Sequence, residues 1–164
     1  MLPSDGDEFD RFGTSISLYE NYVLIGASED DETGTFSGSA YIFMRNGETW
    51  MEIAKLLPSD ASDDARFGNA VALSEDIALI GAFTDDANAN SAGAVYVFHK
   101  QGNSWIEQTK LIASDFSEGA NFGVSISLHD TLALIGANGN NALENPGAAY
   151  VFRQEGIDWI QEDK

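Results

Sequence analysis

The sequence lacks cysteine altogether and is poor in basic residues, with 8 Lys and Arg among 164 residues against 27 Asp and Glu. Without cysteine the chain can form neither disulfides nor thiolate sites, which fits a cytosolic protein or an exported one without covalent cross-links. The net charge of -19 argues against nucleic acid or an anionic membrane surface as a direct partner, because the field of the protein repels phosphate. Cations, basic proteins and neutral polymers remain as ligands.

Long apolar runs are missing as well. No stretch is long enough to span a membrane, and no basic segment followed by an apolar one predicts a signal peptide. If the natural protein is exported, the chain would be its mature part or an excised piece. The 43% of hydrophobic residues is nevertheless enough for a sizeable core, which argues against disorder. We therefore expect one globular unit.

The dominant feature is an internal repeat with a spacing of 55 residues, shortened to 54 near the end. Its recurring residues are Phe12, Gly13, Gly26 and Trp50, then Phe67, Gly68, Gly81 and Trp105, then Phe122, Gly123, Gly136 and Trp159, with Lys55, Lys110 and Lys164 in the same register. The repeat predicts a single repeat domain, 1–164, made of three units, 1–55, 56–110 and 111–164.

Each unit reads as four short strands, which in the first unit are expected at 14–18, 22–27, 39–45 and 50–57. The second is an almost continuous apolar run, as for a strand covered on both faces. The fourth alternates polar and apolar residues and is the expected solvent-side edge. No segment carries a helical period. The sequence therefore predicts an all-β fold of three four-stranded antiparallel β-propeller blades.

These motifs resemble a known family. Phe-Gly before the first strand, Ile-Gly-Ala closing the second and Gly-Ala-Val-Tyr-Val-Phe at 93–98 are similar to FG-GAP repeats, the blade unit of integrin α-subunit propellers and of many bacterial surface or secreted proteins. The resemblance covers the chain end to end. It implies a binding or adhesion scaffold, extracellular or on the cell surface, often with calcium.

The loop between the first and second strands departs from the integrin pattern. In integrins that loop carries a D-x-D-x-D-G calcium site, which supplies the several oxygen ligands that calcium requires. The connections here are Tyr19-Glu20-Asn21, Ser74-Glu75-Asp76 and His129-Asp130-Thr131. Turns this short cannot wrap an ion, so the family's calcium site is not carried over.

The blade topology also predicts that the loops between blades lie beside the loops between second and third strands. Most acidic residues fall on these loops: Asp5, Asp7, Glu8, Asp10, Glu29, Asp30, Asp31, Glu32, Asp60, Asp63, Asp64, Asp85, Asp86, Asp115, Glu118 and Glu144. One interpretation is calcium binding, with candidate ligands Asp30, Asp31 and Glu32, and Asp85, Asp86, Asn88 and Asn90. Asn140 and Asn141 stand at this place in the third unit. The alternative is a hydrated acidic surface that keeps the fold soluble.

Other recurring residues have structural interpretations. Asp5, Asp60 and Asp115 each follow a serine just past a strand, where a Ser-Asp pair typically caps a turn through backbone N–H groups. The three tryptophans could form a sugar-stacking stripe, but their strict recurrence favours packing between blades. The phenylalanines of the Phe-Gly pairs are expected to plug the core between blades.

Catalysis has little support in the sequence. His99 and His129 occupy different repeat positions, and neither has a serine or carboxylate partner at a meaningful spacing. We therefore expect a non-enzymatic scaffold that recognises a protein or a glycan through loops of the acidic face. The alternative is a calcium-stabilised repeat module without a macromolecular ligand there, and a propeller-type glycan hydrolase or lyase is a distant third.

Ring closure is the last question, because propellers have four to eight blades and three cannot close. An open arc leaves an apolar blade face at each end, which soluble monomers avoid. Two solutions follow. The chain is an excised or engineered portion of a longer repeat array, or two copies form a homodimer that closes a six-bladed ring.

Overall fold

The structure is a computed structural model that describes residues 1–86, 88–139 and 146–164. Within these ranges the chain forms strands, turns and loops, and it has no helix long and apolar enough to cross a membrane. The strands are β1 (Phe12–Tyr19), β2 (Tyr22–Ala27), β3 (Ser39–Asn46), β4 (Thr49–Leu56), β5 (Ala70–Leu73), β6 (Ile77–Ala82), β7 (Ala94–Gln101), β8 (Ser104–Leu111), β9 (Phe122–His129), β10 (Leu132–Ala137), β11 (Ala148–Glu155) and β12 (Asp158–Asp163).

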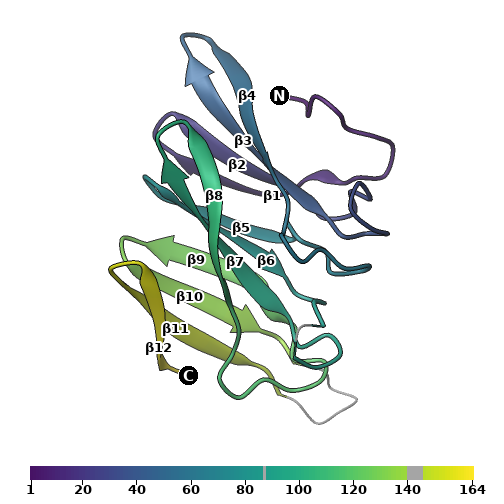
Figure 1. Cartoon of the computed structure of the whole chain (residues 1–164), viewed down its shortest axis with the longest axis vertical. Coiled ribbons are helices and arrows are strands. Elements are labelled where there is room, and N and C mark those ends of the chain that lie inside the picture. Colours follow the sequence, from purple (N-terminus) through teal and green to yellow (C-terminus); the bar gives the residue numbers. More distant parts are fainter. Residues whose placement is uncertain (87, 140–145) are drawn as a thin grey trace.

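The strands form three antiparallel sheets, each with its four strands in sequence order. Figure 1 shows the sheets stacked face to face from β1–β4 to β9–β12, as an open arc and not a ring. The prediction of three four-stranded propeller blades is confirmed. The strand bounds differ from the expected ones by a residue or two: β1 begins at Phe12, β3 ends at Asn46, and β4 covers Thr49–Leu56.

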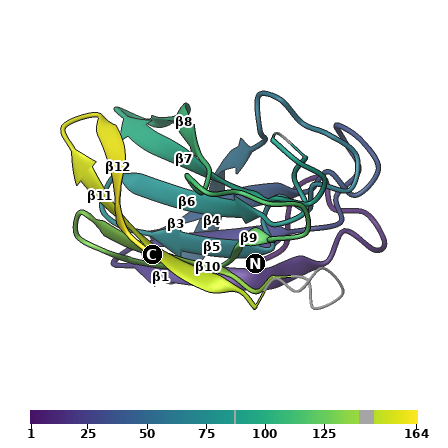
Figure 2. The same ribbon diagram turned by 90° about the horizontal axis from the view of Figure 1, so that it is seen from below.

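The position of each strand in its sheet follows from its polarity. The apolar second strand is an inner strand, and in the middle blade every residue of β6 is buried. The polar fourth strand lies at the edge, as expected, with half-buried and exposed residues along β4 and β8. Figure 2 shows the same stack from below, with the edge strands β8 and β12 on one side of it.

The recurring glycines form the seams between blades. A Cβ atom on Gly26 would lie 1.8 Å from the carbonyl oxygen of Gly68, and one on Gly81 would lie 2.2 Å from that of Gly123. Next to these contacts, Gly38 and Gly93 form parallel bridges with Phe67 and Phe122. No side chain fits where two backbones approach this closely, so the Ile-Gly-Ala glycine of one blade receives the Phe-Gly carbonyl of the next.

The aromatic residues complete the seams. Phe67 and Phe122 are almost fully buried, and each ring lies 5.3 Å from the ring of Tyr96 or Tyr150 respectively, nearly edge to face. Trp105 belongs to the core cluster shared by the first two blades, and Trp159 to the cluster shared by the last two. These four residues thus belong to the core clusters that span neighbouring blades.

The first blade differs, because no blade of this chain covers its outer side. Phe12 and Trp50 are only half-buried and pack against a cluster formed by the first blade alone. Burying a large apolar side chain stabilises a fold by about 1.5–3 kcal/mol. Phe12 and Trp50 therefore stand at the same repeat positions as Phe67 and Trp105, but they are less buried because no preceding blade covers them.

Candidate binding face

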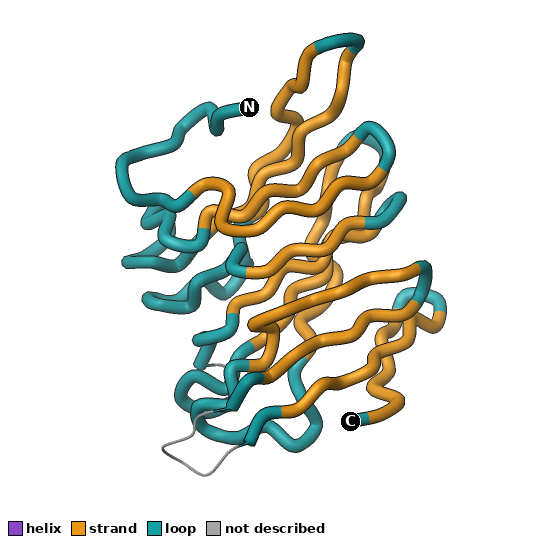
Figure 3. The backbone as a smooth tube through the Cα atoms, turned by 180° about the vertical axis from the view of Figure 1, so that it is seen from behind, coloured by secondary structure: helices purple, strands orange, loops and turns teal. Residues whose placement is uncertain are grey.

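The loops that leave β2 and the loops that enter the next blade meet at one end of the stack, as the blade topology predicts. The backbone N–H of Thr35 donates to Asp63 Oδ1 at 2.9 Å, and that of Asp64 donates to the Thr35 carbonyl at 2.7 Å. Figure 3 shows these longer loops along one edge of the sheets and the short hairpin turns along the other. We call the end with the longer loops the loop face.

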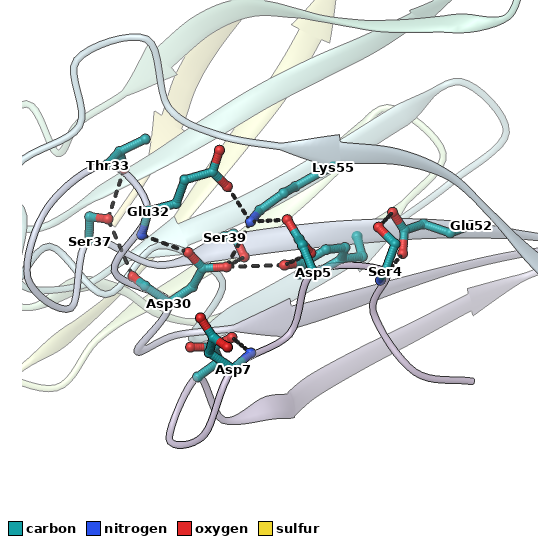
Figure 4. A network of polar contacts seen from close by, with 12 residues as sticks. Ser4, Asp5, Asp7, Asp30, Glu32, Thr33, Ser37, Ser39, Glu52 and Lys55 are labelled. Atoms are coloured by element: carbon teal, nitrogen blue, oxygen red, sulfur yellow. Dashed lines mark hydrogen bonds and ion pairs between the residues drawn. The ribbon is translucent and has the colours of Figure 1, made fainter.

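A polar network lies under the loop face of the first blade (Figure 4). The hydroxyl of Tyr41, a fully buried side chain, lies 2.9 Å from Asp5 Oδ1 and 3.0 Å from Asp30 Oδ2. Lys55 Nζ lies 2.7 Å from Asp5 Oδ2 and 3.0 Å from Asp30 Oδ2, and it also pairs with Glu32. Two aspartates from different loops are thus held by one tyrosine and one lysine from the sheet.

The other blades repeat this Tyr-Asp-Lys network. In the second blade the Tyr96 hydroxyl lies 2.6 Å from Asp60 Oδ1 and 2.9 Å from Asp85 Oδ2, and Lys110 Nζ lies 2.9 Å and 2.8 Å from the same two carboxylates. In the third blade Tyr150 and Lys164 hold Asp115. The third-blade counterpart of Asp30 and Asp85 is Asn140, which lies outside the described residues.

The contacts within the network shift the pKa of several members. A hydrogen bond from Lys55 holds the pKa of Asp5 below its ordinary value of 3.8. Burial raises the pKa of Asp60, but hydrogen bonds from Tyr96 and Lys110 outweigh it and the pKa is lowered. Burial raises the pKa of Tyr96, so its phenol remains a donor at neutral pH. Asp5 and Asp60 are therefore charged at neutral pH, and Tyr96 is neutral.

The serines before these aspartates bind the edge strand of the same blade. Ser4 donates through its backbone N–H and its hydroxyl to Glu52, and Ser59 does the same to Glu107, at 2.7–2.8 Å. The sequence suggested that the Ser-Asp pairs cap turns through the backbone. Their main partners are instead side chains of the third and fourth strands, which attach each incoming loop to its own sheet.

The candidate calcium ligands are in different environments. Asp30 and Asp85 are buried and paired with lysines, and Glu32 contacts Lys55. The remaining candidates are exposed: Asp31, Asp86, Asn88 and Asn90. Asp86 accepts from the backbone N–H of Ser91, and Asn90 donates to Glu118.

These candidates do not converge on one point. Among the described residues no group of three or more acidic, histidine or cysteine side chains is arranged to hold a metal ion. Asn140, Asn141 and Glu144 lie outside those residues. Calcium binding therefore stays a prediction, and the ammonium groups of Lys55 and Lys110 occupy the two buried carboxylates that it would use.

A groove on the loop face of the first blade is a feature that sequence reasoning missed. It has a volume of about 610 Å³ and is lined by Asp7, Glu8, Phe9, Asp10, Glu29, Asp31 and Phe36. Phe9 is 76% exposed and has a φ of 83°, so the loop holds the ring in solvent. Phe36 lies under the guanidinium of Arg66, at 5.6 Å. Nothing in the repeat pattern marks Phe9, because the other units have no aromatic residue at its place.

The fold and the seams define the class of the molecule: it is a β-propeller repeat protein, here with three blades. A family model described as FG-GAP repeat matches residues 1–43, 50–98 and 105–152, and the chain belongs to the FG-GAP repeat family. The resemblance stated from the motifs is thereby confirmed.

A solved structure shares the arrangement of the blades. The crystal structure of Saccharomyces cerevisiae Sqt1 aligns with 95% of this chain at a TM-score of 0.61 and 12% sequence identity. At that identity the likeness concerns the fold alone, and the chain spans only 36% of the length of Sqt1. A sequence comparison with curated proteins finds no match.

Proposed function

We propose that this FG-GAP repeat scaffold is a non-enzymatic binding module whose loop face recognises a basic segment of another protein. The observation that supports this most directly is the groove around Phe9, where exposed carboxylates surround a ring presented to solvent. Carboxylates attract Lys and Arg over a distance, and an aromatic face binds the same cations at contact.

The charges around the groove favour a cationic ligand. Arg11 and Arg66 both pair with Glu29, at 2.7 Å and 2.6 Å, so this carboxylate offsets part of their positive charge. Asp7, Glu8 and Asp31 remain exposed around the groove. Excess negative charge on a rigid sheet end accelerates encounter with a basic partner and excludes acidic ones.

The test is a binding titration with a fluorescein-labelled peptide of alternating Arg and Gly, compared with one of alternating Glu and Gly. We expect the basic peptide to bind and its affinity to fall as NaCl rises from about 50 mM to about 300 mM, because exposed charges are screened. The triple variant Asp7→Asn, Glu8→Gln, Asp31→Asn removes the exposed acids of the groove. We expect this variant to bind the basic peptide about ten-fold or more weakly. Each of the three lost ion pairs is exposed and contributes under about 1 kcal/mol of binding free energy.

A matched control removes three exposed acids from the hairpin turns at the opposite end of the sheets: Glu48→Gln, Glu75→Gln and Asp130→Asn. It changes the net charge by the same amount as the groove variant. We expect its affinity for the basic peptide to stay within about two-fold of wild type once this change in net charge is taken into account. Phe9→Gly removes the ring, with a residue that accepts the positive φ, and should weaken binding a few-fold. Equal loss in both triple variants would contradict a groove-specific interaction. Salt-independent binding of a neutral oligosaccharide, lost in Phe9→Gly, would point to a glycan instead.

A further inference from the structure

The two seams inside the chain have the same construction. At the first seam, Ser15 Oγ donates to the Gly68 carbonyl at 2.9 Å, and the Leu73 N–H donates to Ser17 Oγ at 3.0 Å. The Gly68 carbonyl lies against Gly26, and at the second seam the Gly123 carbonyl lies against Gly81. A seam therefore joins the rear face of one blade, with its Ile-Gly-Ala glycine, to the front face of the next, with its Phe-Gly carbonyl.

The outer side of the third blade is a rear face without a partner blade in this chain. Leu134 is 49% exposed, whereas its counterparts Leu24 and Leu79 are fully buried at the two seams. A Cβ on Gly136 would approach only Ser125 of its own blade, not a neighbouring carbonyl. Ser125 and Ser127 stand at the places of Ser15 and Ser17 and are exposed. The rear face of the third blade thus has the equivalents of the two serines and of the glycine that form the first seam, and we call the space beside Gly136 the notch.

The outer side of the first blade is the complementary front face. Ile16 is 71% exposed, whereas its counterpart Val71 is 8% exposed at the first seam. Nothing lies within 4 Å of a Cβ placed on Gly13, although both Gly68 and Gly123 are packed against the preceding blade. A hollow of about 360 Å³ runs over this face, lined mainly by apolar residues: Met1, Ile16, Leu18, Val23, Ile25 and Trp50.

We propose that the front face of the first blade of one copy docks on the rear face of the third blade of a second copy. In this seam the Gly13 carbonyl enters the notch at Gly136 and accepts from Ser125, and the Leu18 N–H donates to Ser127. Both contacts reproduce the first seam at equivalent repeat positions. The occupant is a second copy because the counterparts of these two faces already meet twice within the chain. The glycine–carbonyl contact is present at both seams, and the two serine hydrogen bonds are those of the first seam.

The docking closes into a dimer. A contact between two different faces leaves one face of each kind unused unless the copies form a ring. Two copies supply six blades, which lies in the range of closed propellers, and both seams of such a ring are identical. The proposal is independent of the proposed function, because the sheet faces that dock are distinct from the loop face.

The first measurement is the mass of the 164-residue chain in solution by light scattering and sedimentation velocity. We expect about twice the chain mass of 17.7 kDa. Ile16→Glu on the front face and Leu134→Glu on the rear face should each raise the dimer dissociation constant about ten-fold or more, because a charge would be buried at the seam. Ile106→Glu is the matched control: Ile106 is 46% exposed and belongs to the middle blade, so it lies on neither of the two docking faces.

Mixing the two variants decides which faces meet. The intact rear face of Ile16→Glu can bind the intact front face of Leu134→Glu, so a mixed dimer has one unmodified seam and one seam with both substitutions. Each variant alone has a charge in both seams. An equimolar mixture should therefore form dimers at concentrations at which each variant alone stays monomeric. A monomeric wild-type chain at high concentration overturns the proposal, and so does a mixture that stays monomeric. A dimer that persists in Leu134→Glu would show front-to-front contact and overturns it as well. Recovery in the mixture also proves that both variants fold.

Discussion

At the scale of single residues, the equivalent lysines of the three blades have unequal partners. Lys110 pairs with Asp85, whose side chain is 3% exposed, whereas the partner of Lys164 among the described residues is Asp115, whose side chain is 45% exposed. Removing the cation beside a buried carboxylate leaves an uncompensated charge, but an exposed carboxylate is solvated by water. The same substitution is therefore expected to have different costs at equivalent places.

We predict that Lys110→Met lowers the free energy of unfolding by about 3 kcal/mol, the lower end for breaking a buried pair, because Tyr96 still donates to Asp85. Lys164→Met should cost clearly less, because water solvates both ions of this exposed pair. Urea denaturation with a two-state fit measures both values. Equal losses in the two variants would show that burial does not set the strength of these ion pairs.

The lowered pKa of Asp60 gives a second residue-scale prediction, in acid. The folded-state pKa lies below the ordinary value of 3.8, so the ion pair contributes its full stability above about pH 4. That contribution is lost as the pH falls through the lowered folded-state pKa. Asp60→Asn should therefore lower stability at pH 7 and reduce the fall in stability between about pH 4 and pH 2. Melting temperatures across this range, with the exposed Glu48→Gln as control, measure the difference; parallel curves for wild type and Asp60→Asn would contradict the assignment.

At the scale of elements, the sequence predicted the blades well, and the reason is physical. The apolar second strand and the glycine-containing turns are local signals, and three repetitions separate them from chance. The glycine at each seam was visible as a motif, but its role was not, because the carbonyl that requires it belongs to the next blade, as for Gly26 and Gly68.

The loop face was predicted less completely. Its acidic character and the pairing of the loops followed from topology alone. The Tyr-Asp-Lys network was missed, because its members lie far apart in the chain and the acids of each loop looked equivalent. The recurrence of Tyr41 and Lys55 in every repeat was the available signal, since a polar residue kept at a strand position in all blades needs a fixed partner. Phe9 carried no such signal, because it does not recur.

The seam glycines give the prediction at this scale. Gly81→Ala would place a Cβ 2.2 Å from the backbone oxygen of Gly123, which cannot move without opening the seam. We expect it to cost about 2 kcal/mol or more, as for overpacking in a core. Gly136→Ala would meet only Ser125 Oγ, at 2.3 Å, and that side chain can change rotamer, so its cost should stay below about 1 kcal/mol.

Both glycine variants are best compared in the Ile16→Glu background, so that a docked second copy does not cover Gly136. The midpoints of urea denaturation, at unchanged slope, give the two losses. Of these two glycines, Gly81 faces a neighbouring blade of this chain and Gly136 does not. An equally large loss of stability in both variants would therefore contradict the idea that the backbone of the neighbouring blade requires the glycine.

At the scale of the whole molecule, the net charge of -19 acts on stability through mutual repulsion. Part of it is compensated locally, since Lys55 and Lys110 lie between the carboxylates that the sequence offered as calcium ligands. The exposed acids of the loop face keep their repulsion. Added salt should therefore stabilise the fold by screening, without requiring a site for any particular ion.

The melting temperature in CaCl₂, in MgCl₂ at equal concentration and in NaCl at equal ionic strength separates screening from a specific site. We expect all three salts to raise it and calcium to exceed magnesium by no more than the error, because the buried aspartates are already paired with lysines. A specific site at 100 times its dissociation constant would add about 2.7 kcal/mol, which a melt resolves easily. A calcium-specific rise, reversed by EDTA and lost in Asp31→Asn with Asp86→Asn, would contradict this expectation and support the calcium interpretation of the acidic loops. Because magnesium carries the same charge but demands a stricter octahedral geometry, the comparison tests for a built site and not for charge alone.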